Sequence, residues 1–346
     1  MAIIGYGLAG RIFHAPLIAT TPGLAVDAIV TADPQRAAQA AAEHPTARIV
    51  PSVDELWAQG APDLVAVAAP NDAHAPLARA AIDRGVAVVV DKPLAVSAAE
   101  AQALVDDAQR AGVPLTVFQN RRWDSDQLTL RRLLAEGALG EVVRYESRFE
   151  RWRPEPDPGK WRERAAPEAG GGVLLDLGSH LVDQARVLFG PVSAVYAEID
   201  ARRGLPGDDD AFLALRHASG TICHLHASAV APAPGPRLRV QGSRAAFVVA
   251  ALDPQEAALR EGARPDGTGA WGRPQEWERG RLVAGERSVP IPGEPGDWPA
   301  FYRLLERALR HGEPPPVDPA DAVAALRVLE AARRSAAQKA VVAVEA

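Results

Sequence analysis

The sequence predicts an α/β protein with two parts: an N-terminal doubly wound parallel sheet, and a C-terminal α+β domain with a mainly antiparallel sheet. Up to residue 120, short runs that are apolar throughout alternate with helical patterns, as in parallel strands covered on both faces. Beyond residue 120, longer strand-like runs are separated by Pro/Gly turns, which favours antiparallel pairing. The 346 residues are enough for two cores, and we place the domains at residues 1–120 and 121–346.

The helices of the N-terminal part carry recognisable start and stop signals. Ser52 and Ser97 are each followed three residues later by Glu, which is the capping-box pattern. Gly85 and Gly112 follow helical stretches and suit C-terminal caps. Between the helices we expect strands at Ala2–Ile4, Leu24–Val30, Leu64–Ala68, Val86–Val90 and Leu115–Phe118.

The C-terminal part contains three predicted helices and a long excursion. One helix spans Ser125–Glu136, an amphipathic one spans Gly172–Phe189, and the last opens at Asp318 with proline following. Residues 253–296 are rich in Gly, Pro and charge and predict an irregular segment. The strand-like runs are Val142–Phe149, Ala194–Ala201, Ala211–Arg216, Thr221–Ser228, Leu238–Gln241 and Ala246–Val249.

The composition argues against several classes of function. The net charge is −6 and no basic run is interleaved with aromatic residues, so nucleic acid is not an expected partner. No apolar stretch is long enough to span a membrane, and we expect no signal peptide because a strand and its glycine turn begin at the first residues. Cys223 is the single cysteine, which favours a reducing, cytoplasmic setting.

A glycine-rich turn follows the first strand and opens a helix. The GxGxxG pattern alone is a weak signal, but this context predicts a dinucleotide whose pyrophosphate faces the helix N-terminus. The alternative is a glycine turn without a ligand. The turn consists of Gly5, Tyr6, Gly7, Leu8, Ala9 and Gly10.

Asp33 ends the second strand, where an acidic side chain can accept hydrogen bonds from the adenosine ribose. A carboxylate there would repel a 2′-phosphate and so favours NAD over NADP, although Arg36 lies one turn further on and could offset it. Asp33 could equally be only the N-cap of the helix that begins at Pro34.

Pro70, Asn71 and His74 follow the strand at Leu64–Ala68 and are expected at the carboxyl edge of the sheet, where open α/β folds bind ligands. We therefore assign them to the cofactor site. The alternatives are an ordinary turn and an ordinary first-turn helix residue.

Lysine is rare in this chain, since only three of the thirty-eight basic residues are Lys. Lys92 ends a fully apolar run and is followed by proline, a place where an ammonium could hydrogen-bond a reacting hydroxyl. Asp91 precedes it and is assigned to the cofactor site. Lys160 is expected to lie in an exposed, ordered loop.

A glycine triplet precedes the second stretch of chemical interest. On one helix Asp176, His180 and Asp183 fall at positions i, i+4 and i+7 and share a face, so that carboxylates can orient the imidazole. The alternative is a solvated polar stripe on an amphipathic helix. The triplet weighs against it, because three successive glycines are costly unless the backbone must approach something closely.

A polar segment follows the strand that ends at Phe118. It combines hydrogen-bond donors, an aromatic face and a carboxylate, which suits a polyhydroxylated ligand, although it could also be a charged helix N-terminus. His14, His217, His224 and His226 are expected to have no chemical role, and no metal site is expected. The substrate-binding candidates are Asn120, Arg122, Trp123, Asp124, Trp161 and Asp183.

These motifs together resemble the glucose–fructose oxidoreductase/inositol dehydrogenase/MocA (Gfo/Idh/MocA) family over essentially the whole chain. The resemblance rests on the glycine turn, the Pro70-Asn71…His74 turn, Asp91-Lys92-Pro93, and the glycine-rich helix with Asp176 and His180. Within the family the chain is most similar to the branch that contains NADP-dependent scyllo-inositol dehydrogenases. The segments that carry this likeness are 120–124, 153–155, 161–163 and 176–180.

The resemblance implies a Rossmann domain followed by a domain with a large open sheet, often used for dimer or tetramer contacts. It implies NAD or NADP as the cofactor and a cyclic polyol or sugar as the substrate, inositol-type in particular. Lys92 and His180 become the catalytic pair, and Asp176 becomes their supporting carboxylate. Two positions depart from the relatives: Asp91 replaces the usual Glu, and Ala32-Asp33 stands where NADP-dependent relatives have Ser-Arg.

Two rival functions remain compatible with the sequence. Some proteins of this fold use bound NAD to cleave glycosides by transient oxidation. A regulator that senses NAD(P) without turnover is also possible, although the intact set of Lys92, Asp176 and His180 argues against it.

Overall fold

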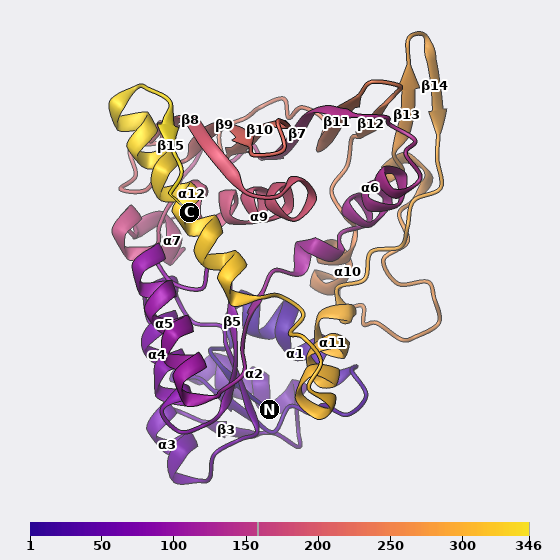
Figure 1. Ribbon diagram of the computed structural model, residues 1–346. Helices are drawn as coiled ribbons and strands as arrows, with labels where there is room; N and C mark the ends of the chain where they lie inside the picture. Colours follow the sequence, from indigo (N-terminus) through magenta and orange to yellow (C-terminus); the bar gives the residue numbers. More distant parts are fainter. Residues whose placement is uncertain (158, 346) are drawn as a thin grey trace. The chain divides into compact units, whose positions relative to one another are not determined.

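The structure is a computed structural model that describes residues 1–157 and 159–345. They form two compact units, coloured by sequence in Figure 1. The first unit comprises residues 1–120, 255–271 and 298–323, and the second comprises residues 121–254, 272–297 and those from 324 onward. The extent of the first unit therefore differs from the predicted domain of residues 1–120, because segments 255–271 and 298–323 also belong to it.

The first unit is built on a six-stranded parallel sheet of order β3-β2-β1-β4-β5-β6, which confirms the predicted doubly wound sheet. The strand order changes direction between β1 and β4, and in such sheets ligands bind outside the carboxyl ends of the strands at this point. The strands are β1 (Ala2–Ile4), β2 (Ala28–Val30), β3 (Arg48–Val50), β4 (Leu64–Val67), β5 (Ala87–Asp91) and β6 (Leu115–Phe118).

Strand β3 was absent from the sequence prediction, and β2 is shorter than the predicted Leu24–Val30. Only three residues of β3 pair with β2, and Pro51, which lacks an N–H donor, follows directly. Three residues are too few for a pattern of period two to stand out.

Helices flank the sheet of the first unit. The capping predictions hold: Ser52 Oγ and Ser97 Oγ each accept a hydrogen bond from the backbone N–H of the Glu three residues on, both at 3.2 Å, and Gly112 ends its helix with φ +66°. The helices are η1 (Ala9–His14), α1 (Ala15–Ala19), α2 (Pro34–Glu43), α3 (Val53–Ala58), η2 (Asn71–Ala73), α4 (His74–Ile82), α5 (Ala98–Ala111), α10 (Gln255–Arg260) and α11 (Pro299–His311).

The later segments complete the core of the first unit. The ring of Phe118 at the end of β6 packs edge-on against Phe301, with ring centroids 4.9 Å apart. The hydroxyl of Thr116 donates a hydrogen bond to the carbonyl of Val317 at 2.7 Å. These contacts join positions separated by almost 200 residues in the chain, so pattern alone could not place them.

The second unit is built on a nine-stranded sheet of order β14-β13-β12-β11-β7-β10-β9-β8-β15. The prediction of a mainly antiparallel open sheet is confirmed, with β7 and β10 as the parallel pair. The strands are β7 (Val142–Glu150), β8 (Val192–Asp200), β9 (Asp210–His217), β10 (Ile222–Ser228), β11 (Leu238–Gly242), β12 (Ala246–Val249), β13 (Arg281–Ala284), β14 (Arg287–Pro290) and β15 (Val342–Ala343).

The excursion predicted at residues 253–296 is partly regular. It contains α10 and the β13–β14 hairpin, whose turn includes Gly285 with φ +58°. Strand β14 is exposed along its whole length, and its four residues show no alternation of buried apolar and exposed polar side chains that would have revealed it.

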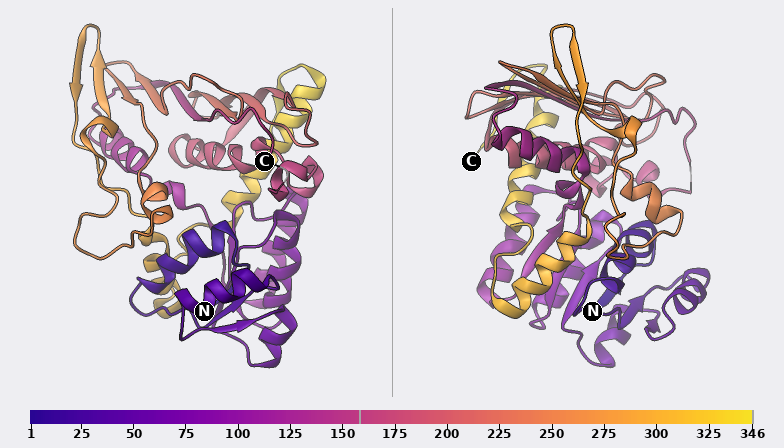
Figure 2. Two further views of the ribbon diagram at one scale, coloured as in Figure 1. Left: turned by 180° about the vertical axis from the view of Figure 1, so that it is seen from behind. Right: turned by 90° about the vertical axis from the view of Figure 1, so that its right-hand side faces the viewer.

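Helices α6 and α9 lie on the same face of the nine-stranded sheet (Figures 1 and 2). Tyr145, Glu146, Ser147 and Phe149 of β7 are buried, and Tyr145 packs against Phe189 of α9 with ring centroids 5.4 Å apart. The remaining helices are η3 (Asn120–Trp123), α6 (Ser125–Ala135), α7 (Trp161–Arg164), η4 (Pro167–Ala169), α8 (Val173–Asp176), α9 (Gly178–Phe189), η5 (Glu276–Glu278) and α12 (Pro319–Gln338).

The amphipathic helix predicted at Gly172–Phe189 is instead two helices, α8 and α9, which meet at Leu177. From Gly178 to Ala185 every residue is buried, so α9 has no solvated polar stripe over this stretch. Asp183 and Gln184 of this stretch bind protein partners, as described below.

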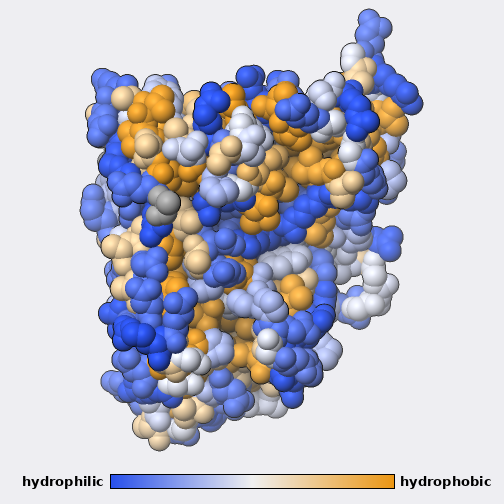
Figure 3. All heavy atoms as spheres, viewed as in Figure 1, coloured by the Kyte–Doolittle hydropathy of each residue, from blue (hydrophilic) through white to orange (hydrophobic). Residues whose placement is uncertain are grey.

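Among the described residues, the helices are all too short or too polar to cross a membrane. Figure 3 shows hydrophobic residues at the surface of the second unit around β8, β15 and α12, interspersed with hydrophilic ones. Val341, which directly precedes β15, is 69% exposed.

Candidate functional site

The glycine turn is shaped by two positions that require glycine and one that is open. Gly5 has φ +98°, and a Cβ atom there would overlap the carbonyl of Ala68. A Cβ on Gly10 would overlap the carbonyl of Gly5. A Cβ on Gly7 would meet only Arg36 Nη1, at 3.9 Å. Space beside the second glycine, with a helix start behind it, fits the pyrophosphate of a dinucleotide.

Tyr6 contributes its backbone to this turn, whereas its side chain is engaged elsewhere. The buried hydroxyl donates a hydrogen bond to Glu43 at 2.7 Å, and Arg11 pairs with the same carboxylate at 2.7 Å. Burial and the hydrogen bond to Glu43 raise the pKa of Tyr6. The side chain thus anchors the turn to α2.

Asp33 is the N-cap of α2, one of the two roles considered from the sequence. Its Oδ1 accepts hydrogen bonds from the backbone N–H groups of Gln35 and Arg36, at 2.9 and 3.1 Å. Its Oδ2 lies 3.6 Å from Arg36 Nε, and both side chains are about half exposed. A cation and an anion therefore stand together at the end of β2.

His74 joins the two loops at the carboxyl ends of β4 and β5. The ring is fully buried, with Nδ1 2.7 Å from the carbonyl oxygen of Pro93 and Nε2 3.0 Å from that of Ala69. Asn71 is also buried, in the short helix η2 that follows Pro70. His74 is the first residue of α4, and its side chain holds the Lys92-Pro93 segment against the β4 loop.

Asp91 ends β5 and Lys92 follows it, and Asp91 lies beside a buried polar group that the sequence did not reveal. Lys92 is 9% exposed and Asp91 is buried. His14 Nε2 lies 3.7 Å from Asp91 Oδ1, and His14 Nδ1 is hydrogen-bonded to the hydroxyl of Tyr302 at 2.6 Å. Burial acts to raise the pKa of Asp91, but the interaction with His14 and the charge of Lys92 outweigh it, and the pKa is lowered.

His14 was expected to have no chemical role, yet it contacts the residue beside Lys92. Its partner Tyr302 is 288 residues away in sequence. The position of His14 on the first helix after the glycine turn is the only sequence feature that could have indicated its contact with Asp91.

In the second unit, the glycine triplet lets a neighbouring turn approach the start of α8. Gly172 has φ +91°, and a Cβ atom there would overlap the carboxylate of Asp208. That carboxylate accepts a hydrogen bond from the Leu174 N–H at 2.6 Å and another from Arg333 Nη2 at 3.0 Å. The close backbone approach expected from the triplet is thus to a capping aspartate.

The three polar residues predicted on one face have different surroundings. Asp176, at the end of α8, is partly exposed, with Oδ1 3.5 Å from Arg162 Nε. His180 is buried in the first turn of α9, with its ring 6.2 Å from that of Phe149. Asp183 is buried one turn further along α9.

Asp183 and Arg122, both substrate-binding candidates, bind each other. Arg122 Nε and Nη2 donate to the two carboxylate oxygens at 2.8 and 2.6 Å, and both side chains are nearly buried. Such a bidentate pair fixes two side chains in one geometry. The residues are 61 apart in sequence, so the pairing was not predictable.

The guanidinium groups of two further arginines lie over the ring of Phe149, the aromatic neighbour of His180. The guanidinium carbons of Arg121 and Arg237 lie 4.8 and 4.1 Å from the ring centroid. Gln184 on α9 links them, because it donates to the Arg121 carbonyl at 2.9 Å and accepts from Arg237 at 3.0 Å. This cluster holds the Phe149 ring in place beside His180. None of its members Phe149, Gln184 and Arg237 was singled out from the sequence.

Asp124 is buried at the N-cap of α6. Burial is the main reason that the pKa of Asp124 is raised, and the carboxylates of Asp253 and Asp126 add to the effect. The charge of Arg121 acts in the opposite direction, and its Nη1 donates a hydrogen bond to Asp124 Oδ2 at 3.4 Å.

The remaining substrate candidates lie in different environments. Asn120 is buried, whereas Trp123 and Trp161 are partly exposed. The Trp161 ring lies 4.8 Å from the Arg162 guanidinium. Lys160 is half exposed and pairs with Asp157 at 2.8 Å, in line with the exposed loop expected for it.

His224 and His226 lie on one face of β10, opposite Glu146 and Arg148 of β7. Their pKa values are lowered, mainly by burial. Over residues 1–157 and 159–345, three or more His, Cys, Asp or Glu side chains nowhere come together in an arrangement that could hold a metal ion.

Comparison with known proteins gives a consistent result. Residues 1–119 match the model of an oxidoreductase family with an NAD-binding Rossmann fold, and residues 127–248 match that of the GFO/IDH/MocA C-terminal domain. The chain is 39% identical to the uncharacterized oxidoreductase YdgJ of Escherichia coli, covering 98% of this chain and 97% of that one. It is 33% identical to the scyllo-inositol 2-dehydrogenase (NADP(+)) IolW of Bacillus subtilis, covering 98% and 94%. Among solved structures, the putative oxidoreductase YvaA of Bacillus subtilis is similar, with a TM-score of 0.92, 32% identity, and 99% and 97% coverage.

Proposed function

Because this chain belongs to the Gfo/Idh/MocA family of oxidoreductases, we propose that it is an NAD(P)-dependent dehydrogenase that oxidises a secondary alcohol of a cyclic polyol or sugar, with an inositol-type substrate favoured. The observation that carries the proposal is the preserved set of Lys92, Asp176 and His180 in a chain that matches a scyllo-inositol dehydrogenase over 98% of its length. We place it in the branch of that relative.

In the proposed reaction His180 removes the proton of the substrate hydroxyl. Histidine is the side chain whose unperturbed pKa lies nearest neutral pH, so it suits a general base in a reversible oxidation. Lys92 donates a hydrogen bond to the same oxygen and stabilises the negative charge that develops on it. Asp176 orients this pair or the neighbouring hydroxyl. When bound, the nicotinamide cofactor supplies the hydride acceptor of the oxidation.

We assign the cofactor site to the glycine turn, Asp33, the β4 loop with Asn71 and His74, and the Asp91-Lys92 strand end. The open side of Gly7 supports a pyrophosphate at this turn. Asp33 favours NAD because its charge opposes a 2′-phosphate, and Arg36 beside it favours NADP for the opposite reason. The preference therefore depends on which of the two charges faces the ribose.

Asn120, Trp123, Asp124 and Trp161 are proposed to bind the other hydroxyls, and the Arg122–Asp183 pair to act as a fixed unit. We further propose a homodimer or homotetramer formed through the nine-stranded sheet. Exposed Val341 and the hydrophobic residues around β8 and β15 support this assembly. A cytoplasmic location completes the proposal.

A cofactor-reduction screen tests the function. Purified protein is incubated with inositols and common aldoses, each with NAD and with NADP, and absorbance at the reduced nicotinamide band is followed. Accumulation of NADH or NADPH with one or a few cyclic polyols is expected. Cleavage of aryl glycosides by tightly bound NAD would instead identify a glycosidase, and cofactor binding without turnover on any polyol would identify a sensor.

Replacing Lys92 by Met tests the catalytic assignment. We expect kcat to fall by on the order of 10²-fold or more, because a donor to the developing oxyanion is lost, while cofactor affinity is kept. Lys339→Met is the matched control, since Lys339 is exposed directly after the end of α12. Turnover of Lys92→Met near the wild-type rate would show that the role is wrong.

A further inference from the structure

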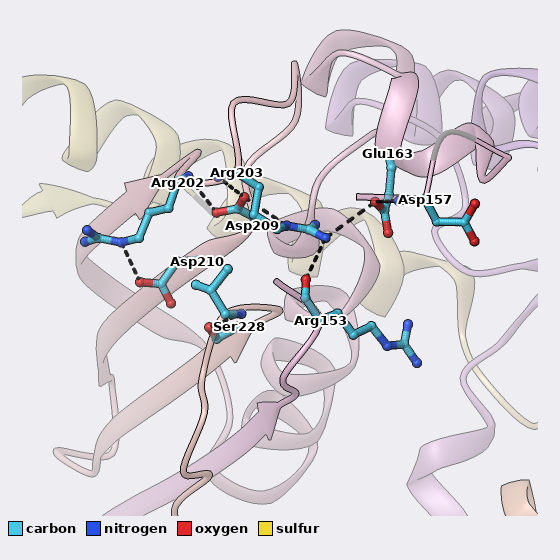
Figure 4. Close-up of polar contacts among 9 residues, drawn as sticks. Arg153, Asp157, Glu163, Arg202, Arg203, Asp209, Asp210 and Ser228 are labelled. Carbon is cyan, nitrogen blue, oxygen red and sulfur yellow. Dashed lines mark hydrogen bonds and ion pairs between the residues drawn. The ribbon is translucent and has the colours of Figure 1, made fainter. Parts of the chain in front are cut away.

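The turn between β8 and β9 contains a buried carboxylate that organises two arginines (Figure 4). Asp209 is fully buried. Its Oδ1 accepts a hydrogen bond from the Arg202 N–H, and its Oδ2 accepts from the Arg203 N–H, both at 2.8 Å. Arg203 Nε donates to the same Oδ2 at 3.1 Å. One carboxylate therefore fixes both the backbone of the turn and the side chain of Arg203.

The guanidinium of Arg203 connects this turn to the α7 segment, which we define as residues 151–157 and 159–164. Arg203 Nη1 donates to the carbonyl of Arg153 at 3.1 Å and lies 3.4 Å from Glu163 Oε2. Glu163 Oε2 also accepts the Asp157 N–H at 2.8 Å. A single side chain, 7% exposed, thus binds both the beginning of the segment and the helix near its end (Figure 4).

The α7 segment carries a cation that faces a proposed active-site carboxylate. Arg162 is the neighbour of Glu163, and its Nε lies 3.5 Å from Asp176 Oδ1. Asp176 ends α8 immediately before Leu177 and α9, which carries His180. The placement of α7 therefore sets the distance between the Arg162 charge and Asp176.

Asp208, which precedes Asp209 in the same turn, holds helix α8, and α8 ends at Asp176. Asp208 caps the N-terminus of α8 through the Leu174 N–H and is held by Arg333. Asp208 and Asp209 thus fix, from consecutive positions, the helix that bears Asp176 and the segment that bears Arg162. Any displacement between these two elements would have to break contacts of this turn.

We propose that Arg203 is a positioning residue for the reaction: it holds the α7 segment so that Arg162 stands beside Asp176. This inference rests on the proposed function for its catalytic consequence. The role requires an arginine, because a planar fork of donors can serve Asp209, the Arg153 carbonyl and Glu163 together, whereas a lysine offers one compact ammonium.

The first test needs no turnover. Hydrogen exchange of peptides that cover the α7 segment is compared among the wild type, Arg203→Ala, Glu163→Ala and the control Arg202→Ala. Arg202 is the sequence neighbour, is 60% exposed, and pairs with Asp200 and Asp210. We expect faster exchange of the segment in Arg203→Ala and Glu163→Ala, and wild-type exchange in Arg202→Ala. Unchanged protection in both of the first two variants would overturn the proposal, and Glu163→Ala decides it if Arg203→Ala does not fold.

The second test measures the kinetics of the proposed reaction. Arg203→Ala is expected to lower kcat/KM for the polyol on the order of 10- to 100-fold, as misplaced active-site groups do, with the KM of the cofactor unchanged. In an Arg162→Ala background the same substitution should cost clearly less than it does in the wild type, because part of the effect of Arg203 acts through Arg162 and only the part that acts through Trp161 of the same segment remains. Losses that multiply in the double variant would refute this mechanism. A wild-type protein without polyol turnover would defeat the proposed function, while the exchange experiment would still decide whether Arg203 fixes the segment.

Discussion

The surroundings of Lys92 illustrate how single residues are held by partners from distant parts of the chain. His74 joins the Pro93 carbonyl to the β4 loop, and His14 stands between Asp91 and Tyr302. All of these groups are buried. Buried polar atoms are costly unless they are paired, so each contact restrains the strand end that carries the ammonium.

Tyr302→Phe should destabilise the first unit by removing one of these contacts. The ring is kept, but Nδ1 of buried His14 loses its partner at 2.6 Å. We expect the free energy of unfolding in urea to fall by about 1–3 kcal/mol, the cost of an unsatisfied buried group. Tyr196→Phe is the control, because its hydroxyl contacts Glu198 on the exposed face of β8 and should cost less than ~0.5 kcal/mol. Equal losses in the two variants would contradict the role given to burial.

At the scale of elements, the local patterns of the chain predicted most of the strands and helices, but not the distant residues that hold them in place. The strand runs and the serine N-caps depend on neighbouring residues, and most of them appear where expected. Strands β3 and β15 are too short to show a period. The glycine triplet signalled a close approach, yet its partner Asp208 lies in a turn more than thirty residues away. Lys92 and His180 could be singled out by local context, whereas His14 and Arg203 depend on contacts that only the fold creates.

Gly172→Ala tests the approach of the β8–β9 turn to α8. The substitution combines a strained backbone, at φ +91°, with an overlap between Cβ and the Asp208 carboxylate. Gly220→Ala is matched to it, since φ is +92° there and a Cβ atom would meet nothing within 4 Å.

We expect about 1–2 kcal/mol of destabilisation for Gly220→Ala, from the backbone alone, and a clearly larger loss for Gly172→Ala. Urea unfolding of both variants measures the difference. If the two losses were the same, Asp208 would move aside without cost, and its capping role would be minor.

At the scale of the whole molecule, burial disfavours the charged form of several histidines. Burial lowers the pKa of His217, and it does the same for His224 and His226. An unfolded chain has histidines with pKa values near 6.5. As pH falls below this value, the unfolded chain binds protons that the folded protein does not, so the stability from these groups, present above pH ~6.5, is progressively lost.

The free energy of unfolding should therefore decrease between pH 7.5 and pH 5.5, and His217→Gln should make the decrease smaller. His217 is 1% exposed, so its contribution can approach ~1.4 kcal/mol per pH unit below its unfolded pKa. His311→Gln provides the comparison, because His311 is exposed at the end of α11. The readout is the pH slope, which is separate from any constant loss caused by the substitution. A slope that His217→Gln leaves unchanged would count against this account.

The three-segment make-up of the first unit has a consequence for synthesis on the ribosome. Residues 1–120 emerge early, but Phe301, Tyr302 and Val317, which complete their core, arrive roughly 200 residues later. At ~5–20 residues per second this is a delay of about 10–40 s. During that interval the nascent parallel sheet has an uncovered apolar flank, so chaperones have their longest opportunity to bind before the C-terminal residues are made. For the same reason, an expression fragment that ends at residue 120 would expose this flank permanently.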